Sequence, residues 1–212
     1  MPPSGEEGPR KRRLVVGISG ASGAAYGIRL LEILATLEIE THLVLTRSAE
    51  LTIAYETDLK TADVKAMAAV CHPVQDLGAA ISSGSFRTLG MVVAPCSVRS
   101  MSEIATGVTS NLLTRAADVT LKERRPLVLM VRETPFHTGH LKTMLALSEM
   151  GAIVAPPLPA FYNRPKTIDD LLDHNCGRVL DLFGIETDRV KRWRETDAGA
   201  PRRGVSRRTP RE

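Results

Sequence analysis

A segment of glycines and serines near the start of the chain has the residue types and the spacing to bind an anion. Gly17, Gly20 and Gly23 follow an apolar run and precede a stretch with helical periodicity. In such a strand–turn–helix unit, unpaired N–H groups at the helix start point at an anion, and glycine lets the backbone approach it. Ser19 and Ser22 add hydroxyl donors. The segment therefore predicts a phosphate-binding loop, and a tight turn that only packs a helix on a sheet is the structural alternative.

Two features of dinucleotide-binding sites are missing from this part of the sequence, and their absence narrows the choice of ligand. Its spacing is Gly-x-x-Gly-x-x-Gly, not the Gly-x-Gly-x-x-Gly of dinucleotide sites. The next expected strand ends in Thr46, Arg47 and Ser48, where an NAD site needs an acidic residue for the ribose 2′-OH. We therefore disfavour NAD and predict a single phosphate or a flavin.

Polar clusters also follow other expected strands, over residues 96–102 and 132–134. The carboxyl ends of parallel strands lie at one edge of a sheet, where ligands of such folds bind. Hydroxyls, arginines and one carboxylate would then line a common rim. This inventory suits FMN better than a free sugar.

Two charged positions have both a functional and a structural interpretation. Arg132 and Glu133 directly follow five apolar residues, so they form either a structural ion pair or a phosphate-binding arginine beside a proton-transferring carboxylate. Lys122 stands at the end of an expected helix, where a solvated cation is already favourable.

Other reactive residue types receive structural interpretations. His137 and His140 are spaced i, i+3, but no third ligand lies nearby, so metal binding is disfavoured. Cys96 has no activating His or Asp placed by the sequence and is interpreted as a packing residue. Three aromatics are assigned to core packing, with stacking on a planar ligand as the alternative: Phe161, Tyr162 and Trp193.

Composition predicts one large domain with basic ends. The chain has 212 residues, 43% of them hydrophobic, and a net charge of +4. Residues 1–13 carry +2 and residues 198–212 carry +4, which leaves −2 for the body. We therefore predict disordered basic tails over 1–13 and 195–212 around one domain over 14–194. Because the basic charge is confined to the tails, we interpret them as solubilising and predict no nucleic-acid partner.

The cysteines and the apolar runs predict a location. The three cysteines are odd in number and form no CxxC pair, which argues for a reducing compartment without disulfides or structural zinc. No apolar run approaches the roughly 18 residues of a membrane span. The first residues lack the apolar segment of a signal peptide. A cytoplasmic protein is predicted.

Apolar runs alternate with helical periodicity along the body of the chain. Strands are expected over residues 14–18, 40–46, 91–94, 126–131 and 152–155. Helices are expected after Gly23 and over residues 48–55, 61–70, from 101 to near Gly107, 111–123, 137–150 and 167–183. Ser48 is expected to cap its helix and Pro95 to end its strand. This order predicts a three-layer α/β fold of the Rossmann or flavodoxin-like type, with a parallel sheet covered by helices on both faces.

Together these residues resemble the UbiX-type flavin prenyltransferases. The matching stretches are GISGASGAAYGIRLLE (17–32), ETD (56–58), SSGSFRTLGMVVAPCS (82–97), LLTRAADVTLKERRPLVLMVRETP (112–135), HLKTMLALSEMGA (140–152) and PAFYNRP (159–165). The resemblance implies transfer of a dimethylallyl group from dimethylallyl phosphate to N5 and C6 of reduced FMN. The product is prenylated FMN, the cofactor of a UbiD-type decarboxylase. The resemblance also implies a homo-oligomer, a dodecamer, with its sites where subunits meet.

The resemblance also assigns residues. It implies FMN contacts from Gly20, Ala21, Ser22, Thr46, Ser97, Val98, Arg99, Ser100 and Arg132. It implies a prenyl-phosphate site formed by Lys122, Arg132, Glu133, Tyr162 and Arg178, with Trp193 near the prenyl group. The catalytic residues that it implies are Ser22, Glu56, Lys122 and Glu133. Thr46 replaces a usual serine and Asn163 a usual histidine.

Side-chain cations can stabilise a phosphate leaving group, so no metal is expected. Two rivals remain. An FMN-dependent decarboxylase of the cysteine-decarboxylating type would need a catalytic His and a substrate-clamp motif, and neither is found in the sequence. A non-enzymatic flavodoxin-like binder would normally surround its flavin with acidic surface instead of a Lys/Arg/Glu cluster.

Overall fold

The chain folds around one sheet of six parallel strands. A computed structural model describes residues 11–189 of this chain. Its strands are ordered β3-β2-β1-β4-β5-β6, and every neighbouring pair is parallel. The strands are β1 (Arg12–Ile18), β2 (Ile39–Leu45), β3 (Val70–His72), β4 (Met91–Cys96), β5 (Leu127–Val131) and β6 (Ile153–Val154). The predicted fold class is confirmed.

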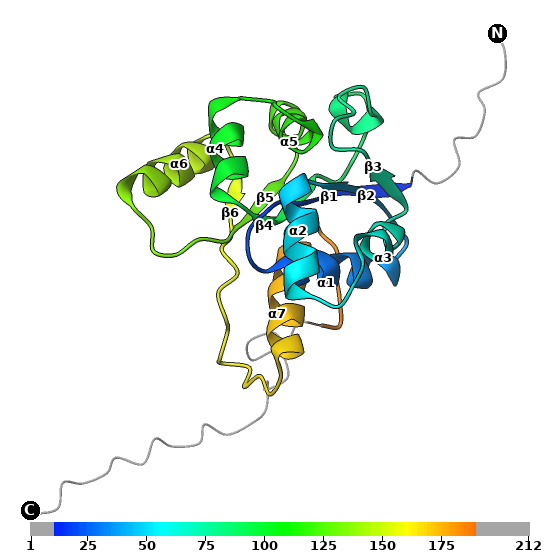
Figure 1. Cartoon of the computed structure of the whole chain (residues 1–212), viewed down its shortest axis with the longest axis vertical. Helices are drawn as coiled ribbons and strands as arrows, with labels where there is room; N and C mark the ends of the chain where they lie inside the picture. Colours follow the sequence, from blue (N-terminus) through cyan, green and yellow to red (C-terminus); the bar gives the residue numbers. More distant parts are fainter. Residues whose placement is uncertain (1–10, 190–212) are drawn as a thin grey trace, which may run out of the picture.

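Helices cover both faces of this sheet (Figure 1). The helices are α1 (Ala24–Ala35), α2 (Arg47–Glu56), α3 (Thr61–Ala66), α4 (Val98–Thr106), α5 (Leu112–Lys122), α6 (Thr138–Glu149) and α7 (Ile168–Asp181), with a short 3₁₀ helix, η1 (Ala80–Ser82). Buried residues of α1, α2, α3 and α7 belong to one hydrophobic cluster, and those of α4, α5 and α6 belong to a second. The sheet separates the two.

Alternation along the strands assigns side chains to the two clusters. In β1, Leu14 and Val16 pack with α1 and α7, whereas Val15 packs with α4 and α5. Because successive side chains of a strand point to opposite faces, a strand covered on both faces is apolar throughout. This explains the unbroken apolar runs of the sequence.

The strand order reverses at β1, which lies between β2 and β4. From β1 the chain moves outward through β2 to β3, and then returns to β4 on the other side of β1. The loops after β1 and β4 are therefore neighbours at the carboxyl edge, and a crevice opens between them. The topology thus places a ligand site at this edge.

Gly27 sets the distance between α1 and the sheet. A Cβ at this position would lie 2.3 Å from the carbonyl oxygen of Ala94 and 2.6 Å from Cδ1 of Ile18. Any larger residue would push α1 away from β1 and β4. The loop that precedes α1 is positioned by the same close approach.

Two strands differ from the predicted bounds by two residues at one end, and the other three predicted strands differ by one residue at one or both ends. β1 begins at Arg12, two residues before the predicted start, because Arg13 pairs in register with Glu40 and its side chain binds that carboxylate. β4 continues through Pro95 to Cys96, although Pro95 was expected to end it. The ladder to β5 shifts register between Val93 and Cys96, so the missing N–H of Pro95 falls where the pairing is already irregular.

The helix predicted over residues 61–70 is wrong in its second half. Helix α3 ends at Ala66, and edge strand β3 follows, which the sequence analysis missed. The N–H of Ala69 donates to Oγ1 of Thr41, which directs the chain toward the sheet. Three residues at an edge are too few to show a strand periodicity.

Two helix starts also differ from their predictions. The N-cap of α2 is Thr46 and not Ser48, since Oγ1 of Thr46 accepts the N–H of Ala49 at 3.1 Å. Helix α4 begins at Val98 instead of residue 101, with Ser97 as its N-cap. In both cases the hydroxyl residue directly after the strand caps the helix.

Within residues 11–189, no helix has the length and the apolar character needed to cross a membrane. Trp193 and residues 195–212 lie outside the described part of the chain. Of the predicted N-terminal tail, only residues 11–13 are described, and two of these belong to β1.

A pair of histidines fastens the edge strand β3 to β2. Nδ1 of His42 lies 2.9 Å from Nε2 of His72, and Nε2 of His42 lies 3.1 Å from Oε1 of Glu40. A hydrogen bond from Arg13 is the main reason why the pKa of Glu40 is lowered to about 2. Burial, together with the neighbouring His42, lowers the pKa of His72.

This pair predicts a loss of stability in mild acid. The unfolded chain protonates His72 near pH 6.5, whereas the folded chain binds this proton only at lower pH. The unfolded state therefore binds more protons, and the free energy of unfolding falls as the pH drops below about 6.5. In urea titrations between pH 8 and pH 5, His72→Gln should show a smaller fall than the unaltered protein. An equal fall in both proteins would contradict this prediction.

Candidate active site

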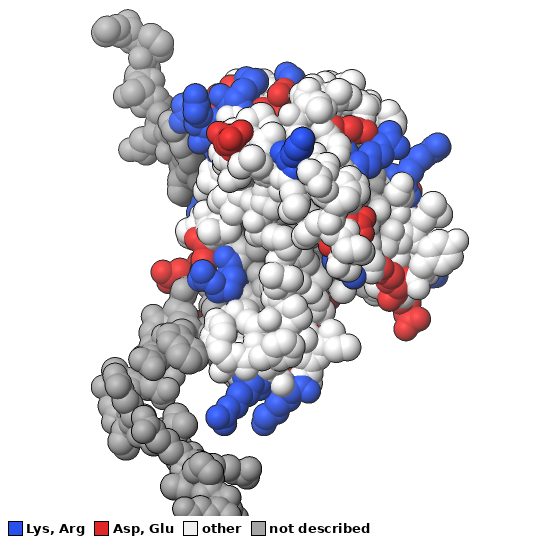
Figure 2. Space-filling model, turned by 90° about the vertical axis from the view of Figure 1, so that its left-hand side faces the viewer, with Lys and Arg blue, Asp and Glu red and all other residues white. Residues whose placement is uncertain are grey.

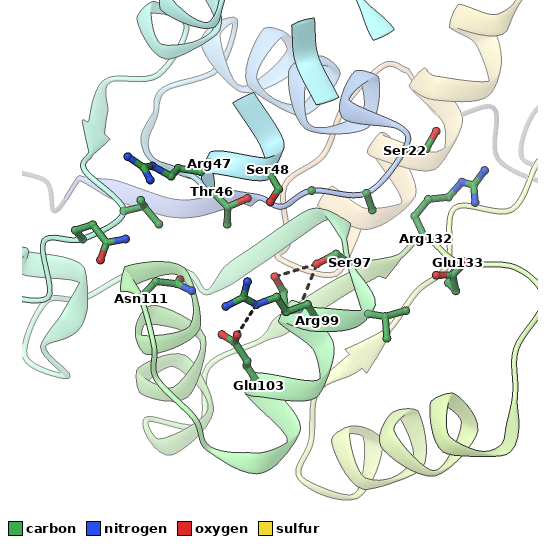
Figure 3. Close-up of a pocket in the computed structure, with 16 residues that line it drawn as sticks. Ser22, Thr46, Arg47, Ser48, Ser97, Arg99, Glu103, Asn111, Arg132 and Glu133 are labelled. Carbon is green, nitrogen blue, oxygen red and sulfur yellow. Dashed lines mark hydrogen bonds and ion pairs between the residues drawn. The ribbon is translucent and has the colours of Figure 1, made fainter. Parts of the chain in front are cut away.

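The carboxyl edge of the sheet holds a cavity of about 540 Å³ (Figure 3). Its walls come from the segments that follow β1, β2, β3, β4 and β5, as the topology requires, and from the start of α5. The lining residues are Gly20, Ala21, Ser22, Thr46, Arg47, Ser48, Val74, Gln75, Ser97, Val98, Arg99, Ser100, Glu103, Asn111, Arg132 and Glu133.

Three helices begin at this cavity, and the N-cap of each is a lining residue. Thr46 caps α2, Ser97 caps α4 and Asn111 caps α5. Each cap accepts one helical N–H, at 3.1 Å for Thr46 and 3.2 Å for the other two. The remaining N–H groups of the first turns and the positive ends of three helix dipoles attract negative charge. The cavity is therefore built for an anion.

Three arginines reinforce this preference. Arg47 in the first turn of α2, Arg99 in the first turn of α4 and Arg132 after β5 all line the cavity. Nε of Arg99 donates to Glu103 at 2.9 Å, and the hydroxyl of Ser110 donates to the other oxygen of that carboxylate at 2.6 Å. Burial alone would raise the pKa of Glu103, but these two hydrogen bonds outweigh it and lower the pKa. Glu103 is thus an ionised support that orients Arg99.

Arg132 and Glu133 do not form the structural ion pair that was one interpretation of the sequence. Within the described part of the chain, Arg132 makes no ion pair, and its backbone N–H donates to the Cys96 carbonyl at 3.0 Å. The Glu133 carboxylate accepts the N–H of Thr134 at 2.9 Å. Both side chains reach the cavity (Figure 3) and are available to a ligand.

The first loop approaches α2 closely at Gly20. A Cβ on Gly20 would lie 2.1 Å from Cβ of Ser48. Glycine therefore allows the backbone of the β1–α1 loop to touch the first turn of α2. At the end of the same loop, Gly23 has a φ of 98°, a left-handed conformation in which glycine is favoured. Ser22, between them, is exposed and lies at the edge of the cavity (Figure 3).

The carboxylate of Glu56 holds the end of this loop by hydrogen bonds to its backbone. One oxygen of its carboxylate accepts the N–H of Gly23 at 2.8 Å and the N–H of Ala24 at 3.0 Å. A carboxylate at a helix N-terminus both satisfies free donors and complements the helix dipole. Glu56 does not line the cavity. In the isolated chain it positions Ser22, and a catalytic role for it stays a prediction.

Ser19 does not serve as the ligand donor that the sequence suggested. It is 1% exposed, and its hydroxyl donates to the Pro95 carbonyl at 2.9 Å. Its oxygen also accepts the N–H of Ser97 at 2.7 Å. The side chain is fully engaged inside the protein, so only Ser22 of the two loop serines is free to contact a ligand.

All nine residues predicted to contact FMN line the cavity, together with Glu133. Whether they bind FMN stays a prediction. Four other predicted site residues do not line it: Glu56, Lys122, Tyr162 and Arg178.

These distant residues lie on opposite sides of the sheet. Lys122 ends α5, about 16 Å along the helix axis from the cap that reaches the cavity, and it pairs with Glu123. Arg178 lies on α7, beyond the other face, and pairs with Asp181. The hydroxyl of Tyr162 lies 3.1 Å from Nε2 of His174. A single chain therefore does not assemble the predicted prenyl-phosphate site.

Six lining residues were absent from the predicted contacts: Arg47, Ser48, Val74, Gln75, Glu103 and Asn111. Arg47 and Ser48 belong to a polar cluster that the strand-end rule already indicated. Asn111 could have been found as an N-cap residue. Val74 and Gln75 follow the missed strand β3, so no sequence signal placed them here.

The structural interpretations of Cys96 and of the two histidines fit the structure. Burial raises the pKa of Cys96 to about 12, as suits a packing residue and not a nucleophile. Nδ1 of His137 accepts the N–H groups of Gly139 and His140 and caps α6. Among the described residues, no group of three or more His, Cys, Asp or Glu could hold a metal ion. Core packing is wrong for Phe161 and Tyr162, which are 70% and 48% exposed.

Comparisons with known proteins identify close relatives. A family model described as Flavoprotein matches residues 4–179. A protein named Flavin prenyltransferase UbiX from Thauera aromatica is 55% identical over 181 residues, which cover 85% of this chain and 93% of that protein.

Two solved structures share the fold at high sequence identity. The crystal structure of AnUbiX (PadA1) in complex with FMN and dimethylallyl pyrophosphate is 48% identical, with a TM-score of 0.86, and the match covers 87% of this chain and 98% of that chain. A dodecameric FMN-dependent UbiX-like decarboxylase from Escherichia coli O157:H7 is 50% identical, with a TM-score of 0.84, and the match covers 85% and 98%.

The close approach of Gly20 to Ser48 predicts that one substitution lowers the affinity for FMN and that a second substitution restores it. Gly20→Ala places a methyl group on Cβ of Ser48, so the loop moves away from α2 and the affinity for FMN should fall about tenfold or more. The double variant Gly20→Ala/Ser48→Gly removes the obstructing atom and should recover most of the lost affinity. Fluorescence titration measures both variants. An equally weak double variant would contradict this steric account.

Proposed function

Because this chain belongs to the UbiX family of flavin prenyltransferases, we propose that it transfers a dimethylallyl group from dimethylallyl phosphate to N5 and C6 of reduced FMN. The product, prenylated FMN, would serve a UbiD-type decarboxylase in ubiquinone biosynthesis or in the decarboxylation of aromatic acids. The high identity to flavin prenyltransferases favours this reaction over decarboxylation by the cysteine-decarboxylating type. A cytoplasmic location remains part of the proposal.

The convergence of three helix N-termini and three arginines on one cavity is the observation that carries this proposal. A phosphate monoester at the cavity would receive backbone N–H groups from α2 and α4, where Thr46 and Ser97 already turn the chain. The cavity volume of about 540 Å³ lies within the usual range for small-molecule sites. FMN fits both requirements, since it has one phosphate and a planar ring system.

The flavin supplies the nucleophilic positions of the reaction, and this chain supplies charge and a proton carrier. Ionisation of an allylic phosphate leaves negative charge on the phosphate. The guanidinium of Arg132, which has no ion pair among residues 11–189, can stabilise that charge. Glu133, the next residue, is exposed and within the same wall, so it can give a proton to the departing phosphate or take the proton released from C6.

The remaining cations of the proposed donor site require neighbouring copies of the chain. Lys122 and Arg178 lie beyond opposite faces of the sheet, so they cannot surround one phosphate within a single subunit. We infer that different subunits supply them. This arrangement is supported by the dodecameric relative.

Helix α6 offers a surface for this assembly. It projects from the body of the molecule (Figure 1), and only Leu147 among its residues is buried. Leu141 and Leu145, one turn apart, are 54% and 60% exposed. The middle of the side of the molecule that carries α6 is largely free of charged residues (Figure 2). An exposed apolar ridge of this kind suits a contact with a second copy.

Incubation with reduced FMN under anaerobic conditions, followed by mass analysis of the flavin, tests the proposed reaction. Parallel reactions with dimethylallyl phosphate and with the diphosphate identify the donor. Failure of both to change the flavin mass would overturn the proposal.

Substitutions at two neighbouring residues should separate binding from proton transfer. Glu133→Gln keeps the shape of the side chain and should retain FMN affinity, but it should slow prenyl transfer by about 10²-fold or more. Arg132→Ala removes a charge-assisted donor and should weaken binding of flavin and donor together, by about tenfold or more. Flavin titration and single-turnover prenylation distinguish the two. If Glu133→Gln retains full turnover, this residue is not an acid or base.

If α6 forms a contact between copies of the chain, substitutions on its exposed face should lower the mass of the oligomer. The double variant Leu141→Asp/Leu145→Asp buries charge at the proposed contact and should give a smaller particle in light scattering, with loss of prenyl transfer. Leu77→Asp is the matched control, because Leu77 is similarly exposed, at 49%, but lies far from α6 in the sequence. An α6 variant with the mass of the unaltered protein would rule out this contact.

A further inference from the structure

Ser19 is buried between two loops that form walls of the cavity, and it does not line the cavity itself. It is 1% exposed. Its hydroxyl donates to the Pro95 carbonyl at 2.9 Å, and its oxygen accepts the N–H of Ser97 at 2.7 Å. The N–H of Ser19 donates to the same Pro95 carbonyl at 3.2 Å. One residue thus joins the loop after β1 to the end of β4 by two hydrogen bonds and to the N-cap of α4 by a third.

Each of the joined loops carries residues of the cavity wall. Residues 20–22 follow Ser19 directly, and on the other side the wall is formed by residues 97–100, the N-cap and first turn of α4. The N–H that Ser19 accepts belongs to Ser97, the N-cap of α4, whose own oxygen accepts the N–H of Ser100 at 3.2 Å. A displacement of Ser19 relative to Ser97 therefore changes the width of the cavity and the direction of the first turn of α4 together.

This link has no substitute in the described part of the chain. Among residues 11–189, every hydrogen bond between residues 19–23 and residues 95–100 involves Ser19. Without the hydroxyl, the N–H of Ser97 would lose its acceptor at a partly buried position, and buried donors rarely remain unpaired. Of the described hydrogen bonds, only the one from the backbone N–H of Ser19 to the Pro95 carbonyl would then remain between these two segments, and the loops would separate or water would enter between them.

We propose that Ser19 is a positioning residue for the flavin: its hydroxyl sets the separation of the β1–α1 and β4–α4 loops without touching flavin or donor. The nature of the ligand rests on the proposed function, whereas the link between the loops does not. The hydroxyl of Ser19 should therefore control flavin affinity and the environment of the flavin ring, although every group that contacts the ligand remains present.

A matched pair of variants isolates the hydroxyl. Ser19→Thr retains it and Ser19→Val lacks it, and both add the same bulk at a buried position. Relative to Ser19→Thr, Ser19→Val should bind FMN about tenfold or more weakly and should alter the visible circular dichroism of the bound flavin. The KM for dimethylallyl phosphate should agree within about twofold between the two. Equal FMN affinities and equal spectra would overturn the proposal.

Hydrogen exchange of the ligand-free protein provides a test that is independent of FMN and of the added methyl group. Ser19→Ala should speed exchange in a peptide that covers residues 97–100 and leave a peptide from α7 at the unaltered rate. If the unaltered protein fails to bind FMN, the proposed function fails while this measurement still tests the link. Unchanged exchange at residues 97–100 would overturn the link.

Discussion

The first N–H groups of an α-helix have no partners within the helix, and this constraint shapes the whole carboxyl edge of the molecule. Helices α2, α4 and α5 all begin at one cavity, and each has a single side-chain cap there: Thr46, Ser97 and Asn111. One cap oxygen satisfies only part of a helix start, so several donors remain directed toward the cavity. Three helix dipoles add to this positive potential. An anionic ligand is the complement that the fold itself requires.

The polar side chains around the cavity divide into two groups by their hydrogen bonds. The side chains of the first group bind other parts of the protein and hold them in place. Ser19 binds a carbonyl and a backbone N–H, Glu56 accepts backbone N–H groups, and Glu103 accepts a hydrogen bond from an arginine. Arg132 and Ser22 line the cavity, and their side chains make no such hydrogen bond within residues 11–189. The hydrogen-bonded residues of the first group fix the segments that carry the second group. The binding groups are therefore preorganised, which limits the entropy lost when a ligand binds.

The parallel sheet also explains why one chain cannot bring together the cations of the proposed donor site. A sheet covered on both faces separates α5 from α7, and the cations at the ends of these helices cannot meet around it. Only packing of further copies can bring such residues to one phosphate. The exposed leucines of α6 offer apolar area for the proposed packing. The same three-layer architecture thus accounts for the fold and for the need of the proposed site for further copies.

Periodicity and glycine spacing in the sequence determined the fold class, most elements and the group of loops that forms the site, because these features depend on local residue order. Residues 46–48, 97–100 and 132–133 were found by their positions after apolar strands. Strand β3 was missed, because edge pairing leaves little trace in three residues. The bonding of Ser19 and the separation of Lys122 from Arg178 appeared only in the tertiary structure. The partner of a hydroxyl, or the distance between two cations, depends on which distant segments meet, and local sequence does not contain that information.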